Sequence, residues 1–131
     1  MREILFRGKR VDTGEWVHGD LIHHDGYVAI WDKNASYVED FEVIPESVGQ
    51  YTGLTDENGK KIFEGDIVTF KTFTQKLKAE VIYKGGEYWC KSKCGKELLS
   101  IVVENCKKDC ELHCEIIGNI HDNPELLEVK L

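Results

Sequence analysis

The cysteines are the residues of this sequence whose type and spacing could hold a metal ion. They are Cys90, Cys94, Cys106, Cys110 and Cys114, all in the last third of the 131 residues. Zinc takes four nitrogen or sulfur ligands in a tetrahedron, so the first four could form a four-thiolate site, with His113 or Cys114 as a replacement ligand. The gap of three residues within each pair is permitted for zinc but is not typical. A zinc-stabilised module is therefore one hypothesis.

Ordinary packing is the alternative for the same cysteines. If CELHCEII is a strand, Cys110 and Cys114 share one apolar face, where cysteine acts as a small buried hydrophobe. The odd number of cysteines argues against a disulfide framework, and the lack of a Cys-x-x-Cys pair argues against redox chemistry. Packing is the favoured interpretation, so we expect no metal ligands and no cofactor, with zinc as the alternative.

The segment HGDLIHHDG is the other polar cluster that could do chemistry. On a strand, His18, Asp20 and His24 would lie along one face, as an acid–base pair or half of a metal site. Such residues more often lie on the solvent face of a hairpin, and the adjacent His23 and His24 would point to opposite sides. Because no serine lies in a nucleophile-elbow context and no cysteine has an activating neighbour, we expect no enzymatic activity.

The stretch VGQYTGLTDENGKKIFEGDIV, residues 48–68, concentrates acids and glycines that suggest calcium or phosphate binding. An EF-hand loop needs glycine at its sixth position and glutamate at its twelfth, but counting from Asp56 the glycine is fourth and Glu64 is ninth. The glycines are not followed by the Gly-Lys-Ser/Thr of a phosphate loop. We therefore interpret the stretch as turns: Asp56 to Gly59 fits a type I turn closed by a left-handed glycine, or a two-residue Asn58-Gly59 loop.

Charge is distributed unevenly along the chain. The net charge is −7, but residues 69–108 hold nine lysines and four acids, a local excess of +5, between acidic flanks. Such a segment could contact a phosphate backbone, although lysines on a solvated β surface are a commoner reason for it. The candidate nucleic-acid contacts are Lys71, Lys76, Lys78, Lys84, Lys91, Lys93 and Lys96. The overall acidity makes nucleic acid an unlikely partner.

Short strands and tight turns must position these residues, so the fold is expected to be mainly β. Asp12-Thr13-Gly14 and Asp25-Gly26 predict hairpin turns and an N-terminal antiparallel meander of about 1–44, with a possible strand over 37–44. Later strands at 67–70, 77–84 and 87–93 predict a small SH3-like bent sheet or barrel at about 48–121. Together they would form one domain, residues 1–131.

Three short helical segments are also expected. Leu98, Ile101, Val102 and Cys106 follow three- and four-residue steps and predict a helix near 97–106, although the β-branched run at 101–103 would also suit a strand. Pro45 and Pro124 each suit the first position of a helical turn, the second as a C-terminal turn with Asp122 or Asn123 as its cap.

Three segments of the chain resemble the YopX family, small proteins encoded by bacteriophages and prophages. They are ILFRGKRVDTGEWVHGDLI, VGQYTGLTDENGKKIFEGDIV and IIGNIHDNPELL, and the resemblance covers essentially the whole chain. It implies a β-rich fold of strongly bent sheets, expression in the cytoplasm of a bacterial host during phage growth, and no established biochemical activity. It supplies no catalytic residues, and the cysteine-bearing stretch from Cys90 to Cys114 departs from the family pattern.

The function expected from the sequence is a non-catalytic protein-binding or self-assembling module. Its contacts with a second copy, or with a phage or host protein, would be made by sheet edges and by exposed aromatics such as Trp16, Trp31, Tyr51, Tyr88 and Trp89. The alternatives are a nucleic-acid-binding accessory protein and the zinc-stabilised module. No apolar run reaches the roughly 18 residues of a membrane helix, so a cytoplasmic protein without a membrane partner is expected.

Overall fold

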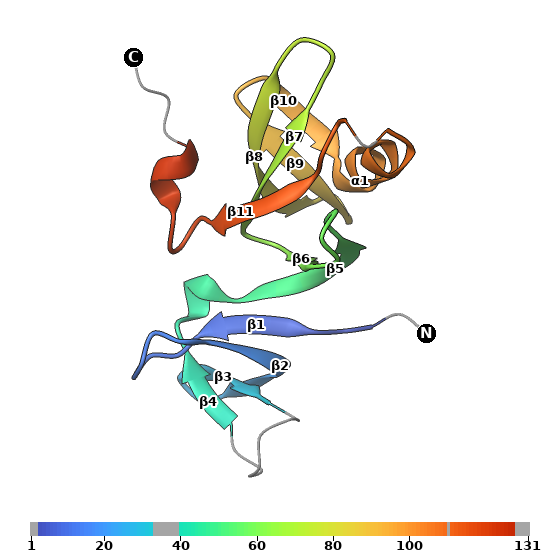
Figure 1. Cartoon of the computed structure of the whole chain (residues 1–131). Coiled ribbons are helices and arrows are strands. Elements are labelled where there is room, and N and C mark those ends of the chain that lie inside the picture. The colour runs from blue at the N-terminus through green and yellow to red at the C-terminus, as the bar shows by residue number, and fades with distance from the viewer. Residues whose placement is uncertain (1–2, 33–39, 110, 128–131) are drawn as a thin grey trace. The chain divides into compact units, whose positions relative to one another are not determined.

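The computed structural model describes residues 3–32, 40–109 and 111–127, and within them the fold is mainly β, as expected. Figure 1 shows antiparallel strands with one α-helix and two short 3₁₀ helices. The strands follow the orders β4-β3-β2-β1-β5-β6 and β10-β9-β8-β7-β11. The chain divides into two compact units, Met1–Gly53 and Leu54–Leu131, and the division falls within β5.

The first unit is the predicted meander, built from β1 (Phe6–Lys9), β2 (Trp16–His24), β3 (Tyr27–Trp31) and β4 (Asp40–Val43). The 3₁₀ helix η1 (Pro45–Ser47) then leads into β5 (Gly49–Thr55), which pairs with β1. Both predicted hairpin turns form, with Gly14 and Gly26 at positive φ. Of the possible strand over 37–44, residues 40–43 are confirmed as β4, and residues 37–39 lie outside the described part.

Strand β2 changes partner halfway along its length. It pairs with β1 through Trp16–Gly19 and with β3 through Asp20–His24. Gly19 lies at the change, where a Cβ atom would stand 1.9 Å from the main-chain oxygen of Trp31. Only glycine allows the backbones to approach this closely.

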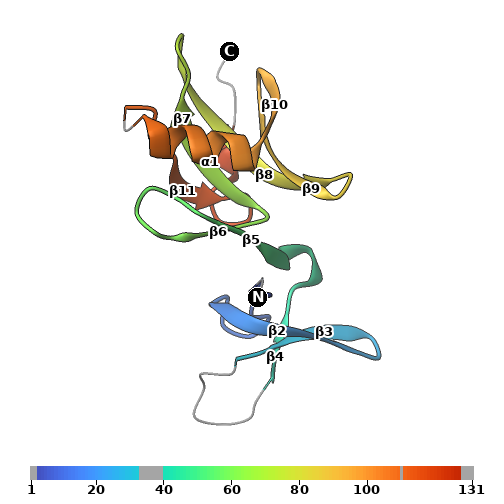
Figure 2. The same ribbon diagram turned by 90° about the vertical axis from the view of Figure 1, so that its right-hand side faces the viewer.

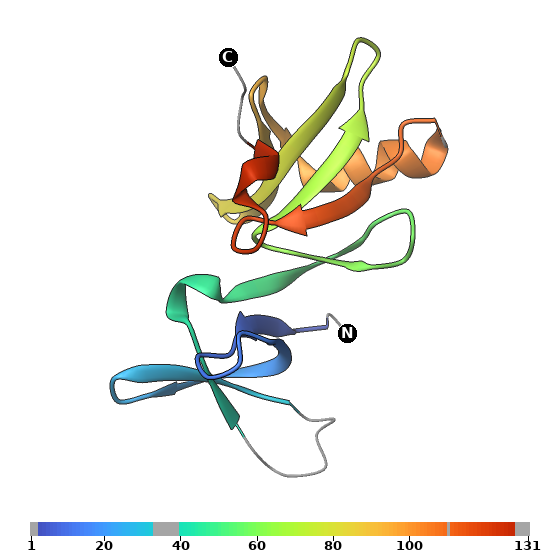
Figure 3. The same cartoon turned by 60° about the vertical axis from the view of Figure 1, so that its left-hand side comes forward.

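The second unit contains the bent sheet and the helix. Its strands are β6 (Lys61–Phe63), β7 (Asp66–Lys71), β8 (Lys76–Lys84), β9 (Glu87–Ser92), β10 (Gly95–Leu98) and β11 (Glu115–Asn119). Helix α1 (Leu99–Lys108) lies across one face of the sheet (Figure 2), and η2 (Pro124–Leu127) follows β11 (Figure 3). Because β10 and β11 are the two ends of the strand order, the described strands form a bent sheet and not a closed barrel.

The core of this unit lies between the sheet and α1. Strand β7 is buried at every position but its last, and β8 buries Leu77, Ala79 and Val81 in strict alternation. Leu99, Val102 and Val103 of α1 cover these residues. A strand buried at alternate positions has one face left for solvent, and that face carries the lysines considered below.

The predicted helix near 97–106 is confirmed, but it is shifted and rotated. Residues 97 and 98 belong to β10, and the helix runs from Leu99 to Lys108. Its buried face contains Leu99 and Val103, whereas Ile101, which we expected on that face, is 52% exposed. Extended backbone at Leu98, with φ −61° and ψ 128°, ends the strand and sets the phase of the helix.

Candidate functional site

The tip of the β7–β8 hairpin presents the most exposed aromatic side chain of the described residues. Phe73 has a relative exposure of 103% and lies between Thr72 and Gln75. The N–H of Thr72 donates to the carbonyl of Gln75 at 2.8 Å and closes the turn. The Thr72 hydroxyl also accepts hydrogen bonds from the N–H groups of Thr74 and Gln75, at 3.4 and 3.2 Å. The turn is therefore held by its polar neighbours, while Phe73 stays in solvent.

A pocket of about 220 Å³ adjoins Phe73, between this hairpin and helix α1. Its apolar lining comes from Phe70, Val102 and Leu112, together with Phe73 itself. Its polar lining comes from the remaining residues, Lys71, Thr72, Glu97, Asn105 and Cys106. A pocket with an apolar lining and a few polar groups is the usual form of a site that receives one side chain or small ligand.

The segment after α1 forms one wall of this pocket because it is fastened to β7. The N–H of Lys71 donates to the carbonyl of Leu112 at 2.7 Å, and the N–H of Leu112 donates to the carbonyl of Asp109 at 3.1 Å. Residues 111–114 are thus not part of the strand expected for CELHCEII, which begins only at Glu115. His113 adopts a φ of 41° in this turn.

The cysteines of the proposed zinc set occupy different environments. Cys90 is buried in the core, whereas Cys94 is exposed in the β9–β10 turn, where its Sγ accepts a hydrogen bond from Gln75 Nε2 at 3.1 Å. Cys106 lines the pocket beside the buried Cys114, and Cys110 lies outside the described residues. Within residues 3–32, 40–109 and 111–127, no three His, Cys, Asp or Glu side chains are grouped to hold a metal ion.

Burial makes the two core thiols weak acids. Desolvation raises the pKa of Cys90 to about 12, with the neighbouring Cys114 adding to the effect, and it raises the pKa of Cys114 to about 12, with Cys106 adding to it. Burial also raises the pKa of Cys106. Since the thiolate is the nucleophile, these cysteines are poorly suited to nucleophilic or redox chemistry.

We expect iodoacetamide to modify Cys94 well before Cys90 and Cys114 in the folded protein. At a pH of about 8 the raised pKa values keep both buried thiols protonated, and burial also excludes the reagent. Mass spectrometry of peptides from a labelling time course measures the order of modification, and a Cys94→Ser variant identifies the early product. Modification of Cys90 as fast as Cys94 would contradict the described core.

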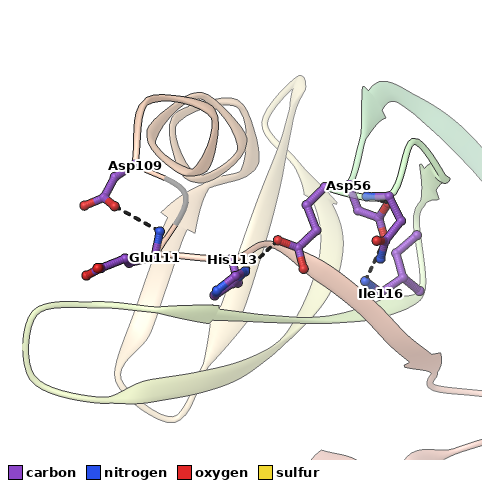
Figure 4. A network of polar contacts seen from close by, with 7 residues as sticks. Asp56, Asp109, Glu111, His113 and Ile116 are labelled. Carbon is purple, nitrogen blue, oxygen red and sulfur yellow. Dashed lines mark hydrogen bonds and ion pairs between the residues drawn. The ribbon is translucent and has the colours of Figure 1, made fainter.

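Two acids of residues 48–68, Asp56 and Asp66, accept hydrogen bonds from backbone amides, which agrees with the interpretation of this stretch as turns. Asp56 is 6% exposed, and its Oδ1 accepts from the N–H groups of Asn58 and Lys60 at 2.9 Å each. Its Oδ2 accepts from the N–H of Ile116 at 3.0 Å (Figure 4). The type I alternative is confirmed by the Gly59 N–H bond to the Asp56 carbonyl and by the φ of 79° at Gly59. Asp66 Oδ2 likewise accepts from the N–H of Phe63 at 2.7 Å.

A second polar contact joins the same turn to the segment before β11. His113 Nδ1 lies 2.8 Å from Glu57 Oε2, and the N–H of Glu57 donates to the carbonyl of Cys114 at 2.9 Å. Nearby, the Glu111 N–H donates to Asp109 Oδ1 at 3.0 Å (Figure 4). His113 is therefore engaged in holding two segments together and is not grouped with the cysteines as a metal ligand.

The histidine cluster of β2 is divided by the change of strand partner. His18 pairs with Arg7 in the β1–β2 ladder, whereas Asp20 and His24 belong to the β2–β3 ladder. His24 Nε2 lies 2.8 Å from Asp40 Oδ2, and its ring stacks on Tyr27 with centroids 4.5 Å apart. His24 is thus held by Asp40 and Tyr27 on the exposed side of the meander, and it does not form the expected cluster with His18.

The aromatics proposed for protein contacts are mostly packed. Tyr51 is buried, and Trp16, Trp31, Tyr88 and Trp89 are half-buried. Among the aromatics that the structure describes, the exposed ones are instead Tyr27, Phe73 and Tyr83. Phe73 was missed by sequence reasoning, although a single apolar residue inside the polar turn KTFTQK is the signal that could have identified it.

The structure brings six of the seven candidate lysines to one sheet face. Strand alternation and register place Lys71, Lys76, Lys78, Lys84, Lys91 and Lys96 opposite the core residues. Lys93 lies apart from them, in the β9–β10 turn. In the part of the chain that the structure describes, no helix is long and apolar enough to cross a membrane.

The segment IIGNIHDNPELL forms a compact turn after β11. Asn119 Oδ1 accepts from the N–H groups of His121 and Asp122, at 3.0 and 2.9 Å. Asn123, one of the two expected caps of η2, instead bonds back to β11, where its Oδ1 accepts from the N–H of Asn119 at 3.3 Å. A Cβ atom on Gly118 would stand 2.5 Å from that same oxygen. This motif, like residues 48–68, is used to turn the chain.

The YopX protein family model matches residues 5–128, nearly the whole chain. This chain belongs to the YopX family. A solved structure, that of protein EF1440 from Enterococcus faecalis, is 26% identical, and the match covers 98% of this chain and 100% of that one with a TM-score of 0.66. No curated protein matches the chain significantly. The family assignment thus agrees with the motifs of the sequence and with the fold, and it leaves the biochemical activity open.

Proposed function

We propose that this YopX-family protein is a non-catalytic binding module that self-associates through the Phe73 tip and the adjoining pocket. The observation that carries the proposal is the position of a fully exposed phenylalanine beside an opening with an apolar lining. A projection next to a pocket is complementary to itself about a two-fold axis, because each copy can insert its projection into the other. The module would act in the cytoplasm of a bacterial host of a phage or prophage.

The non-catalytic part of the proposal is supported by how the polar candidates are used. Asp56 and Asp66 accept backbone N–H groups, and the pKa values of Cys90 and Cys114 are raised by burial. Catalytic groups more often combine perturbed protonation with access to a cleft. Cys106 does line the pocket, but burial raises its pKa and so disfavours the reactive thiolate. These groups stabilise turns and core, which favours a function carried by surfaces.

The expected dimer is weak. Burying one phenylalanine contributes about 2 kcal/mol, so two Phe73 side chains contribute about 4 kcal/mol. The loss of translational and rotational freedom costs about 4 kcal/mol or more. Ile101, on the α1 helix that also lines the pocket, is 52% exposed and can add apolar contact. Self-association should therefore appear only at high protein concentration.

Sedimentation equilibrium over a wide concentration range tests this proposal. The unchanged protein should increase in apparent mass with concentration, and a Phe73→Ser variant should remain monomeric because the inserted side chain is lost. Val11→Ser is the matched control, since Val11 is 54% exposed and lies in the other unit. A protein that stays monomeric at its highest soluble concentration, or a Phe73→Ser variant that still dimerises, would rule out this mode of assembly.

A further inference from the structure

The outer face of the five-stranded sheet concentrates positive charge on an otherwise acidic protein. Lys76, Lys78 and Lys84 project from β8 on the side opposite its buried residues. The strand register places three more lysines on this side. Lys71 of β7 lies opposite Lys76, Lys91 of β9 lies opposite Glu80, and Lys96 of β10 lies opposite Lys91. The basic face is defined here as these six lysines, which span four neighbouring strands.

The acids on the same face are fewer. Glu80 lies between Lys91 of β9 and Ile67 of β7, Glu87 lies opposite Lys84, and Glu115 lies opposite Thr69. On this face, six lysines and three glutamates leave an excess of three positive charges, whereas the whole chain carries −7. An excess of one sign on one surface attracts polyanions even when the protein as a whole is acidic.

The lysines at the β10 end lie close enough to perturb one another. The pKa of Lys96 is lowered, first by the close approach of the Lys84 side chain and its positive charge, with a smaller contribution from Lys91. Like charges held this close repel each other, and an anion between them would relieve the repulsion.

An aromatic side chain lies among these lysines. Trp89 pairs with Ile82 and Leu98 on the outer face, and its indole Nε1 donates to the carbonyl of Lys84 at 3.0 Å. The Lys96 ammonium lies 5.7 Å from the centre of the Trp89 ring. Lysines that neutralise phosphates beside an aromatic that can stack on a base are the two parts of a single-strand-binding surface.

We propose that the basic face binds single-stranded nucleic acid without sequence preference, with the lysines on the phosphates and Trp89 against a base. The Trp89 indole favours nucleic acid over other polyanions. A membrane surface or an acidic protein would pair with the lysines but would offer the half-buried indole no base to stack on. The two proposals share Lys71, which also lines the pocket, so the variants that test the basic face leave both Lys71 and Phe73 unchanged.

The test is fluorescence anisotropy with a labelled single strand of about 16 nucleotides and a duplex of the same length. At about 50 mM salt the single strand should bind more tightly than the duplex, and the affinity should fall steeply toward about 200 mM salt. Combined Lys84→Ala, Lys91→Ala and Lys96→Ala substitutions should weaken binding at least about tenfold and reduce the salt slope by about 2.

The matched control changes the same charge elsewhere in the same unit. Lys60→Ala, Lys107→Ala and Lys108→Ala remove three lysines that lie outside β7 to β10, and they should leave affinity within about twofold. The proposal is overturned if neither oligonucleotide binds at low salt, if the control loses as much affinity as the basic-face variant, or if the duplex binds as tightly. Binding to anionic lipid vesicles without binding to the single strand would also overturn it.

Discussion

Replacing Gly19 with alanine is expected to unfold the first unit. The new Cβ atom would stand 1.9 Å from the Trp31 oxygen and 2.7 Å from the Trp31 carbon. Both are backbone atoms of a paired strand, so no side chain can rotate away, and the β2–β3 ladder must separate. We expect a loss of more than about 4 kcal/mol in the free energy of unfolding, at the extreme of single substitutions.

Urea denaturation followed by tryptophan emission measures this effect in the first unit. Trp16 and Trp31 belong to that unit and Trp89 to the other, so a Trp89→Phe background isolates the signal. Gly26→Ala is the control in the same unit, because nothing lies within 4 Å of its added Cβ and the cost there comes only from the positive φ of 88°. The control should cost about 1 to 2 kcal/mol. Equal losses in the two variants would show that the approach to Trp31 is not tight.

Replacing Asp56 with alanine is expected to have the second large effect. The substitution removes the acceptor of three backbone N–H groups, those of Asn58, Lys60 and Ile116, at a site that is 6% exposed. Hydrogen bonds to a charged acceptor contribute about 1.5 to 3 kcal/mol each, and a buried unsatisfied donor costs about 1 to 3 kcal/mol. Because water can reach part of the opened turn, we expect a total loss of about 3 to 5 kcal/mol.

Urea denaturation and hydrogen exchange together test the role of this carboxylate. The free energy of unfolding should fall, and the amide of Ile116 should exchange faster in Asp56→Ala. The neighbouring Glu57→Ala is the matched control: it removes a partly exposed contact with His113, and such surface pairs contribute about 0 to 1 kcal/mol. An Asp56→Ala variant that is no less stable than Glu57→Ala would mean that the turn holds without its side-chain acceptor.

Local features of this protein could be predicted from sequence because their causes lie within a few residues. Gly14, Gly26 and Gly59 take positive φ in turns, and Asp56 accepts the amides that follow it. The features that were missed depend on distant partners. The requirement for Gly19 comes from Trp31 on another strand, and the bond between Asp56 and Ile116 joins residues 60 apart.

The candidate sites also combine features with local causes and features that depend on distant residues. Alternation along β8 predicts that Lys76, Lys78 and Lys84 share a face, but only the strand register adds Lys91 and Lys96. The phase of α1 was ambiguous because Leu98 and Leu99 are adjacent leucines, and the end of β10 decides which of them is buried. The exposure of Phe73 depends on a turn that was read from sequence only as a link between strands.

From the sequence separation of their partners, we expect the two oxygens of the Asp56 carboxylate to form their bonds at different stages of folding. Oδ1 binds amides two and four residues ahead, and such contacts can form within an isolated turn before any long loop closes. Oδ2 waits for Ile116, whose arrival requires a 60-residue closure and therefore most of the sheet. The Oδ1 bonds therefore stabilise the early local turn, and the Oδ2 bond stabilises only the folded sheet. A bond that forms after the transition state slows unfolding without speeding folding.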